Sequence, residues 1–245
     1  MKKLILTFLL IAPLFATELT ITTEDGYELH GWLEKPQSAT KTTPIVLLAH
    51  QFGADHTSWD TLIKKLNEKG MATLSVDLRG HGKSIMQKGV ENKVEVPKNT
   101  SEVRTAFDAS SNKVGFLNIP QDLIAWLELI EEDKGLDMSK LYLIGASLGG
   151  SSLIPVLNEY DAKALITLSA GKSRSSESDM ALSTSMSKMY FIATKNDPLG
   201  ASTNALEYGK KTITGTTLIL SGDGHGTVLL PKVEDYIFLF IEMAK

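Results

Sequence analysis

The chain has 245 residues, of which 42% are hydrophobic and 22% charged, and its formal net charge is −4. It is long enough to bury a sizeable core in one α/β domain, and its charge gives no basic footprint of the kind that binds nucleic acid. The absence of cysteine excludes disulfides, a thiol nucleophile and cysteine-ligated zinc, and the five histidines show no metal-ligand spacing, so we expect no metal and no cofactor.

The first sixteen residues have the order of segments found in a secretory signal peptide. Lys2 and Lys3 precede an apolar run over residues 4–12, and Ala16 ends the stretch before the sequence turns polar. The apolar run is short for a membrane span. We therefore expect cleavage after Ala16, a periplasmic or secreted protein without stable membrane association, and one folded domain over residues 17–245. An uncleaved membrane anchor is the alternative.

The domain opens with a predicted hairpin and continues with alternating strands and helices. Residues 18–23 and 27–33 alternate apolar with polar side chains around an Asp25-Gly26 turn, and residues 43–50 form the continuous apolar run of a buried parallel strand. Further strands are predicted at residues 71–76, 141–144, 162–168, 189–193 and 216–220, and helices at 57–69, 120–135, 148–159, 202–211 and 231–244. This alternation predicts an α/β fold with about eight strands in a mostly parallel sheet and helices on both faces.

One segment, residues 85–118, interrupts the alternation. It is polar, weakly periodic and longer than a compact domain normally leaves without structure. A short helix is predicted over residues 100–107, capped by Thr100 or Ser101. Such a segment is either a surface insert or a flap beside a site.

The strand at residues 141–144 runs directly into Gly145-Ala-Ser-Leu-Gly149 and then into a predicted helix. Glycines two residues before and two residues after Ser147 permit a turn so tight that the serine is strained and its hydroxyl is pushed out of the fold. This is the G-x-S-x-G pattern of a nucleophile elbow. A phosphate-binding loop is disfavoured, because no Lys-Ser or Lys-Thr follows the glycines. A plain strand-to-helix turn is the other alternative.

Two further residues at predicted strand ends complete a pattern for nucleophilic catalysis. A serine hydroxyl becomes a good nucleophile when a neutral imidazole takes its proton, and a carboxylate must orient that imidazole. Ser147 is followed by Asp197 and then by His225, each just past a strand. Ligands of doubly wound sheets lie at the carboxyl ends of strands. We predict Ser147 as nucleophile, His225 as base and Asp197 as acid. Asp223 competes for the last role, but it lies in a glycine-rich turn where Asp is common.

These motifs together resemble the α/β-hydrolase superfamily, close in pattern to its dienelactone-hydrolase-like and small serine-esterase branches. The resemblance is carried by residues 50–53 (HQFG), 77–84 (DLRGHGKS) and 145–150 (GASLGG), and by the order Ser147, Asp197, His225. It covers essentially the whole chain after the leader and implies an α/β-hydrolase fold. Dienelactone hydrolases use a cysteine nucleophile, which this chain lacks, so an ester hydrolase is favoured.

The resemblance also implies an oxyanion hole made by the backbone N–H groups of Leu148 and Phe52. Gln51 stands where many relatives have glycine, which leaves open whether the Gln51 or the Phe52 amide points inward. The Gln51 side chain is expected to contact the substrate. Three polar residues near strand ends are expected to be structural rather than catalytic: His50, Arg79 and His81.

The activity that the resemblance implies is that of a serine carboxylesterase, which cleaves small or medium acyl esters through an acyl-enzyme. The predicted signal peptide adds that the enzyme is exported. Only about twenty residues separate the strand ending near residue 168 from the one starting at 189, where many relatives insert a helical lid. An open site without a large lid suits small esters, and residues 85–118 are a hypothetical wall of the acyl or alcohol pocket. Peptidase, thioesterase or acyltransferase activity on the same triad is an alternative, as is a non-catalytic binding protein on the hydrolase scaffold. No oligomeric state is predicted.

Overall fold

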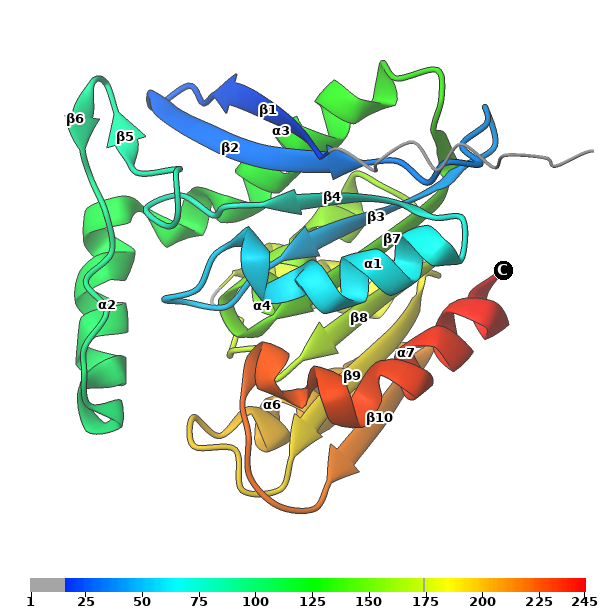
Figure 1. Ribbon diagram of the computed structural model, residues 1–245. Helices are drawn as coiled ribbons and strands as arrows, with labels where there is room; N and C mark the ends of the chain where they lie inside the picture. Colours follow the sequence, from blue (N-terminus) through cyan, green and yellow to red (C-terminus); the bar gives the residue numbers. More distant parts are fainter. Residues whose placement is uncertain (1–15, 174) are drawn as a thin grey trace, which may run out of the picture.

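The structure is a computed structural model that describes residues 16–173 and 175–245 (Figure 1). Apart from Ala16, the predicted signal peptide lies outside the described residues. Within these ranges no helix combines the length and the apolar character needed to cross a membrane.

The described residues form a ten-stranded sheet in the order β10-β9-β8-β7-β3-β4-β2-β5-β6, and β1 pairs with β2. Neighbouring strands from β10 to β4 are parallel, and the pairs that involve β1, β2, β5 and β6 are antiparallel. The strands are β1 Thr17–Thr22, β2 Tyr27–Glu34, β3 Pro44–Ala49, β4 Ala72–Val76, β5 Met86–Gln87, β6 Val90–Glu91, β7 Asp137–Ala146, β8 Ala164–Leu168, β9 Lys188–Thr194 and β10 Gly215–Leu220. The eight predicted strands are present, and the two-residue strands β5 and β6 are additional.

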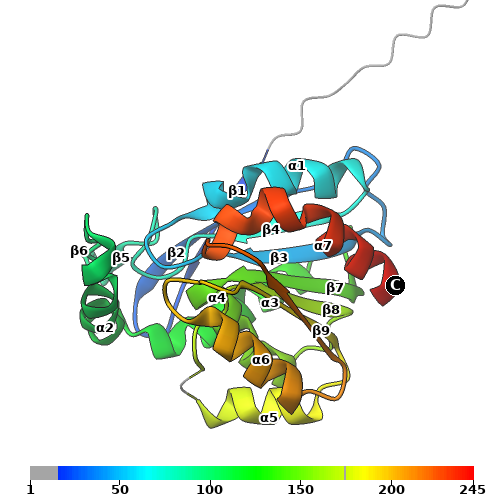
Figure 2. The same cartoon turned by 90° about the horizontal axis from the view of Figure 1, so that it is seen from below.

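Helices cover both faces of the sheet, as Figure 2 shows with α1 and α7 on one side and α5 and α6 on the other. The helices are α1 Asp60–Glu68, α2 Val103–Val114, α3 Ile119–Glu131, α4 Ser147–Leu153, α5 Ser176–Thr184, α6 Ala201–Lys211 and α7 Leu230–Ala244. Side chains of β3 alternate between two cores: Val46 and Leu48 pack with α1 and α7, while Ile45 and Leu47 pack with α3, α4, α5 and α6. The apolar run of β3 is therefore explained by burial on both faces.

Several helices differ in length from the prediction. The helices α1 and α3 are shorter than the predicted 57–69 and 120–135, and for α4 and α2 the reason for the difference is local. The predicted helix over residues 148–159 is divided into α4 and a 3-10 turn, Pro155–Asn158, because proline has no N–H to continue an α-helix. The helix predicted over residues 100–107 is instead α2, which begins after Glu102 without a side-chain cap and continues to Val114. It ends at Gly115, whose φ of +79° is the left-handed conformation of a helix C-terminus.

No large lid lies between β8 and β9 in the described part of the chain. That connection contains the nine-residue α5, longer than the one or two turns predicted there. The segment over residues 85–118 instead forms β5, β6 and α2, which stand together at one side of the sheet (Figure 1). The loops that follow β3, β7, β9 and β10 carry the four groups of candidate site residues.

Candidate active site

The chain turns sharply between β7 and α4, and Ser147 occupies the turn. Ala146 is extended, with φ −114° and ψ 134°, whereas Ser147 has a φ of +46°, which few non-glycine residues adopt. The flanking glycines are required by close packing. A Cβ at Gly145 would lie 2.7 Å from Gly150 Cα, and one at Gly149 would lie 2.3 Å from the Ala49 carbonyl oxygen. The G-x-S-x-G spacing therefore forms the strained turn that the sequence predicts.

Asp197 and His225 are brought together by the loops that follow β9 and β10. His225 Nδ1 lies 2.8 Å from Asp197 Oδ2 and 3.0 Å from Oδ1. The Asp197 side chain is fully buried, and 17% of the His225 side chain is exposed. Asp223, the competing acid, is exposed. Since Nδ1 faces the carboxylate, Nε2 is the ring nitrogen that is left for proton transfer.

The Asp197 carboxylate is held by more than the histidine. Its Oδ1 accepts hydrogen bonds from the backbone N–H groups of Leu199 at 2.9 Å and Ala201 at 3.3 Å. Burial alone would raise the pKa of this carboxyl. The hydrogen bond and charge of His225, together with the Leu199 N–H, outweigh burial and hold the pKa below its ordinary value. Asp197 is therefore an ionised and fixed partner for the imidazole.

The loop after β3 fixes the direction of one backbone amide. The Gln51 carbonyl oxygen accepts from His50 Nδ1 at 2.7 Å and from the Ala54 N–H at 3.2 Å. The peptide between Gln51 and Phe52 is trans, so the Phe52 N–H points away from this carbonyl oxygen. No hydrogen bond from the Phe52 N–H is made to another described residue. This amide is therefore directed away from the His50 ring.

The Gln51 side chain joins this loop to the loop that carries His225. Its Nε2 donates to Thr227 Oγ1 at 3.0 Å, and its Oε1 accepts from the Thr227 N–H at 3.3 Å. A Cβ at Gly226 would lie 3.0 Å from Gln51 Oε1, so the amide packs closely over that glycine. The elbow joins the same group of loops, because the Gly149 N–H donates to the His50 carbonyl oxygen at 3.1 Å. Through these contacts the loops around Ser147, Gln51 and His225 are connected. Among the described residues no hydrogen bond joins the Ser147 hydroxyl to His225.

The residues expected to be structural are engaged in the interior. His50 is fully buried, donates from Nδ1 to the Gln51 carbonyl oxygen and accepts from the Leu78 N–H at Nε2, at 3.0 Å. Burial lowers the pKa of His50 to about 3 and that of His81 to about 4, so both rings are neutral. Arg79 is buried and pairs with Asp122 at 2.6 Å and with Asp25 at 2.8 Å. The ion pair of Arg79 and the hydrogen bonds of the two histidines within their loops agree with a structural role.

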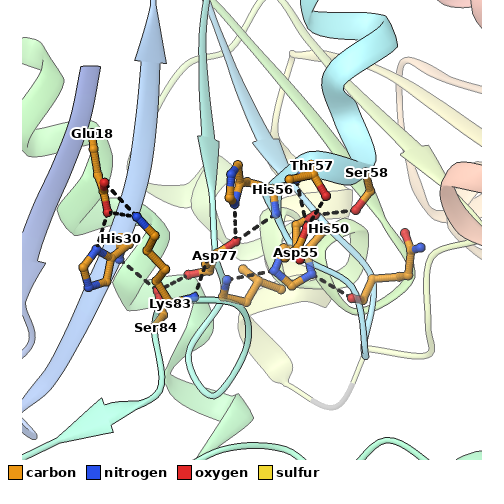
Figure 3. Close-up of polar contacts among 12 residues, drawn as sticks. Glu18, His30, His50, Asp55, His56, Thr57, Ser58, Asp77, Lys83 and Ser84 are labelled. Atoms are coloured by element: carbon orange, nitrogen blue, oxygen red, sulfur yellow. Dashed lines mark hydrogen bonds and ion pairs between the residues drawn. The ribbon is translucent and has the colours of Figure 1, made fainter. Parts of the chain in front are cut away.

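A second histidine–aspartate pair, His56 with Asp77, was not predicted from the sequence. His56 Nδ1 lies 2.8 Å from Asp77 Oδ1, and the same oxygen accepts the His56 backbone N–H at 2.8 Å (Figure 3). The Lys83 backbone N–H donates to the other oxygen at 2.7 Å. The His56 ring stacks on Trp32 with centroids 3.3 Å apart. Asp77 therefore organises the loop over residues 77–84 as well as orienting a histidine.

An aromatic cluster connects the loop after β3 to the segment over residues 85–118. The Phe52 ring lies 5.4 Å from Phe107 of α2, 5.7 Å from His81 and 6.1 Å from Phe116, between ring centroids. Phe52 and Phe107 remain partly exposed. The segment thus packs directly against a residue of the candidate oxyanion hole.

Comparison with known proteins identifies the type of domain. A family model described as serine aminopeptidase, S33, matches residues 40–195, a range that includes Ser147 and ends just before Asp197. No curated protein sequence gives a significant match.

Among solved structures, the chain is similar to esterase Est1E from Butyrivibrio proteoclasticus with ferulic acid bound, at 17% identity and a TM-score of 0.66, over 91% of this chain and 99% of that one. It is also similar to the esterase PF2001 from Pyrococcus furiosus, at 14% identity and a TM-score of 0.66, over 94% and 91%. The α/β hydrolase GrgF from a Penicillium species gives 14% identity and a TM-score of 0.69, over 94% and 99%. These likenesses show the α/β-hydrolase fold.

Proposed function

Because this chain belongs to the serine aminopeptidase (S33) family of α/β hydrolases, we propose that it is a serine carboxylesterase with Ser147, His225 and Asp197 as its catalytic triad. The observation that carries the proposal is the 2.8 Å contact between His225 Nδ1 and the buried Asp197 carboxylate. This contact supports catalysis only together with a nucleophile. Ser147 is the candidate, because its φ of +46° at the strand-to-helix turn is the strain expected of a nucleophile elbow.

In the proposed reaction the Ser147 hydroxyl oxygen attacks the ester carbonyl carbon while its proton moves to His225 Nε2. The resulting imidazolium is stabilised by Asp197 and then gives the proton to the departing alcohol, which leaves an acyl-enzyme. Water attacks the acyl group in the second half of the reaction, again with His225 as base. The acid is released and Ser147 regains its proton.

The carbonyl oxygen becomes an oxyanion in both steps, and we assign the backbone N–H groups of Leu148 and Phe52 to it. The hydrogen bonds of the Gln51 carbonyl oxygen favour Phe52 over Gln51 as the second donor, because they turn the Phe52 N–H to the opposite side. Gln51 is then better explained as a bridge to Thr227 than as a substrate contact. Loss of one such oxyanion donor costs on the order of a hundredfold in rate or more.

The substrate we propose is a small or medium ester, aromatic acyl groups included. The esterase names and the ferulic acid in the Est1E structure support an ester over other acyl compounds. The family description favours a second candidate, an aminopeptidase on the same triad. Thioesterase or acyltransferase activity would use the same residues. An exported location and the absence of stable membrane association are also proposals, supported by the sequence of residues 1–16.

The decisive test is labelling by a fluorophosphonate probe together with hydrolysis of p-nitrophenyl esters. Ser147→Ala should abolish labelling and lower kcat at least about ten-thousandfold, with an unchanged fold. Ser151→Ala is the matched control, because Ser151 lies one turn later on α4 and donates to the Leu148 carbonyl oxygen. It should be labelled normally. Absence of labelling of the unmodified protein would contradict the proposal and favour a binding protein.

A substrate panel separates the two candidate activities. Aryl esters of increasing acyl length, matched thioesters and aminoacyl amides should be compared by kcat/KM. The carboxylesterase proposal expects esters to be the best substrates. Faster turnover of aminoacyl amides would instead establish the aminopeptidase.

A further inference from the structure

Ser169 lies between the two strands that carry the proposed nucleophile and acid. It follows β8, and β8 lies between β7, which leads to Ser147, and β9, which leads to Asp197. Its backbone N–H donates to the Ile192 carbonyl oxygen of β9 at 2.7 Å. The residue is therefore fixed at the carboxyl-end edge of the sheet, where the proposed triad is assembled.

The local conformation of Ser169 is unfavourable. Its φ is +52°, and among the described residues only Lys88 and Ser147 are the other non-glycine residues with positive φ. The side chain is fully buried, yet its hydroxyl makes no well-formed hydrogen bond. Strained backbone and an unsatisfied buried hydroxyl both reduce stability, and glycine would avoid both. Strain of this kind is typical of functional sites.

Ser169 and Asp197 follow the neighbouring strands β8 and β9, at the same edge of the sheet. Burial raises the pKa of the Asp197 carboxyl, whereas His225, the Leu199 N–H and, least, the Ser169 hydroxyl lower it. The Asp197 oxygens already accept from His225 and from the N–H groups of Leu199 and Ala201. A carboxylate offers about four acceptor positions, so a further donor can be accommodated.

We propose that Ser169 is a positioning residue for Asp197, whose hydroxyl turns to donate to the carboxylate when His225 becomes an imidazolium; the inference rests on the proposed triad. In that state the carboxylate interacts with a full positive charge, and any movement away from His225 would weaken the stabilisation. A buried donor on the neighbouring strand holds it in place.

The test uses Ser169→Gly and Ser169→Ala, which both remove the hydroxyl. Each should lower kcat for p-nitrophenyl acetate roughly fivefold with little change in KM, the effect of losing one hydrogen bond in the transition state. The downfield proton resonance of the His225 Nδ1–H, which reports its hydrogen bond to Asp197, should shift in both variants. A purely structural serine would not move this resonance. Ser169→Gly should be at least as heat-stable as the unmodified protein, because glycine accepts positive φ.

Two control variants test relief of backbone strain and removal of a buried hydroxyl separately. Lys88→Gly relieves the same type of strained backbone between β5 and β6, and Thr73→Val removes a buried hydroxyl on β4 that also lacks a hydrogen-bond partner. Both should leave kcat and the His225 resonance unchanged. Any stabilisation they give measures strain or burial alone.

The His225 proton resonance tests the role of Ser169 even if the protein has no measurable esterase activity. If the unmodified protein hydrolyses no ester, the proposed function fails, but a shifted His225 resonance in Ser169→Gly would still support the positioning of Asp197. An unshifted resonance would overturn the inference. So would an active enzyme in which both Ser169 variants keep the original kcat.

Discussion

The two histidine–aspartate pairs of this protein have nearly the same local geometry. In each, Nδ1 of the ring lies 2.8 Å from a carboxylate oxygen of a fully buried aspartate side chain. The exposed fractions of the histidine side chains are also close, 17% for His225 and 22% for His56. By distance and burial alone, either pair could serve as the base and acid of a hydrolase.

The surroundings of the two rings differ. One face of the His56 ring is covered by Trp32, and the hydroxyls beside it, on Thr57 and Ser58, both donate to Asp55. His225 instead lies in a loop that Gln51 ties to the residues beside the strained elbow. A histidine–aspartate pair is therefore a structural element that a protein can use to build a loop, and it becomes a candidate base only where a nucleophile is presented to it.

Replacement of each histidine by glutamine should separate the two pairs most clearly. We expect His225→Gln to lower kcat for p-nitrophenyl esters about ten-thousandfold, since the proton of Ser147 would have no acceptor. His56→Gln should keep kcat within about threefold and lose about 1 to 2 kcal/mol of unfolding free energy, measured in urea, because it removes a hydrogen bond to a buried carboxylate. Equal loss of activity in both variants would mean that the His56 pair participates in the reaction.

Acid should act on the candidate acid and on the buried histidines in different ways. Burial opposes ionisation of Asp197, but the hydrogen bond and charge of His225 hold the pKa of this carboxyl below its ordinary value. Asp197 should therefore remain ionised, and able to orient His225, at any pH near neutrality.

The unfolding free energy should also depend on pH, through His50 and His81. Burial lowers the pKa of His50 to about 3 and that of His81 to about 4, whereas the pKa of a histidine in the unfolded chain is about 6.5. Each histidine therefore takes up a proton on unfolding when the pH lies between its folded and its unfolded pKa. Their stabilising effect is present above that unfolded value and is lost as the pH falls. Together they should reduce the unfolding free energy by about 2 to 3 kcal/mol per pH unit between pH 6 and 5. Urea titrations at several pH values measure this slope.

Short-range features of the site were predictable from the sequence. The elbow depends on glycines within two residues of Ser147, and the strand-end positions of Asp197 and His225 follow from apolar runs that precede them. Arg79 was predicted to be structural, and it forms an ion pair with Asp122. The two-sided burial of β3 also follows from its continuous apolar run. The order of the strands in the sheet was not predicted.

The features that escaped prediction depend on contacts between distant segments. His56 and Asp77 meet because β3 and β4 pair in parallel with Ala49 opposite Val76, which brings the two following loops together. Gln51 and Thr227 are 176 residues apart in the sequence. Ser169 has no flanking pattern that would mark it, because the parallel pairing of β8 with β9 places it beside the strand that leads to Asp197. None of these partners is encoded by local spacing.

The smallest expected effect concerns α2, which packs on the candidate oxyanion loop through Phe107. The Phe107 and Phe52 rings meet nearly edge to face, at 73°. Phe107→Ala should change the ratio of kcat/KM values between aromatic and acetyl esters by about three- to tenfold, the contribution of one aromatic contact. Its rate of labelling by a small fluorophosphonate should stay within about twofold of normal, because the proposed triad is untouched. Phe238→Ala is the control, since that ring lies on α7 beneath Lys69. An unchanged ester preference after Phe107→Ala, and after deletion of the segment over residues 85–118, would show that this segment is a surface insert rather than a wall of the substrate pocket.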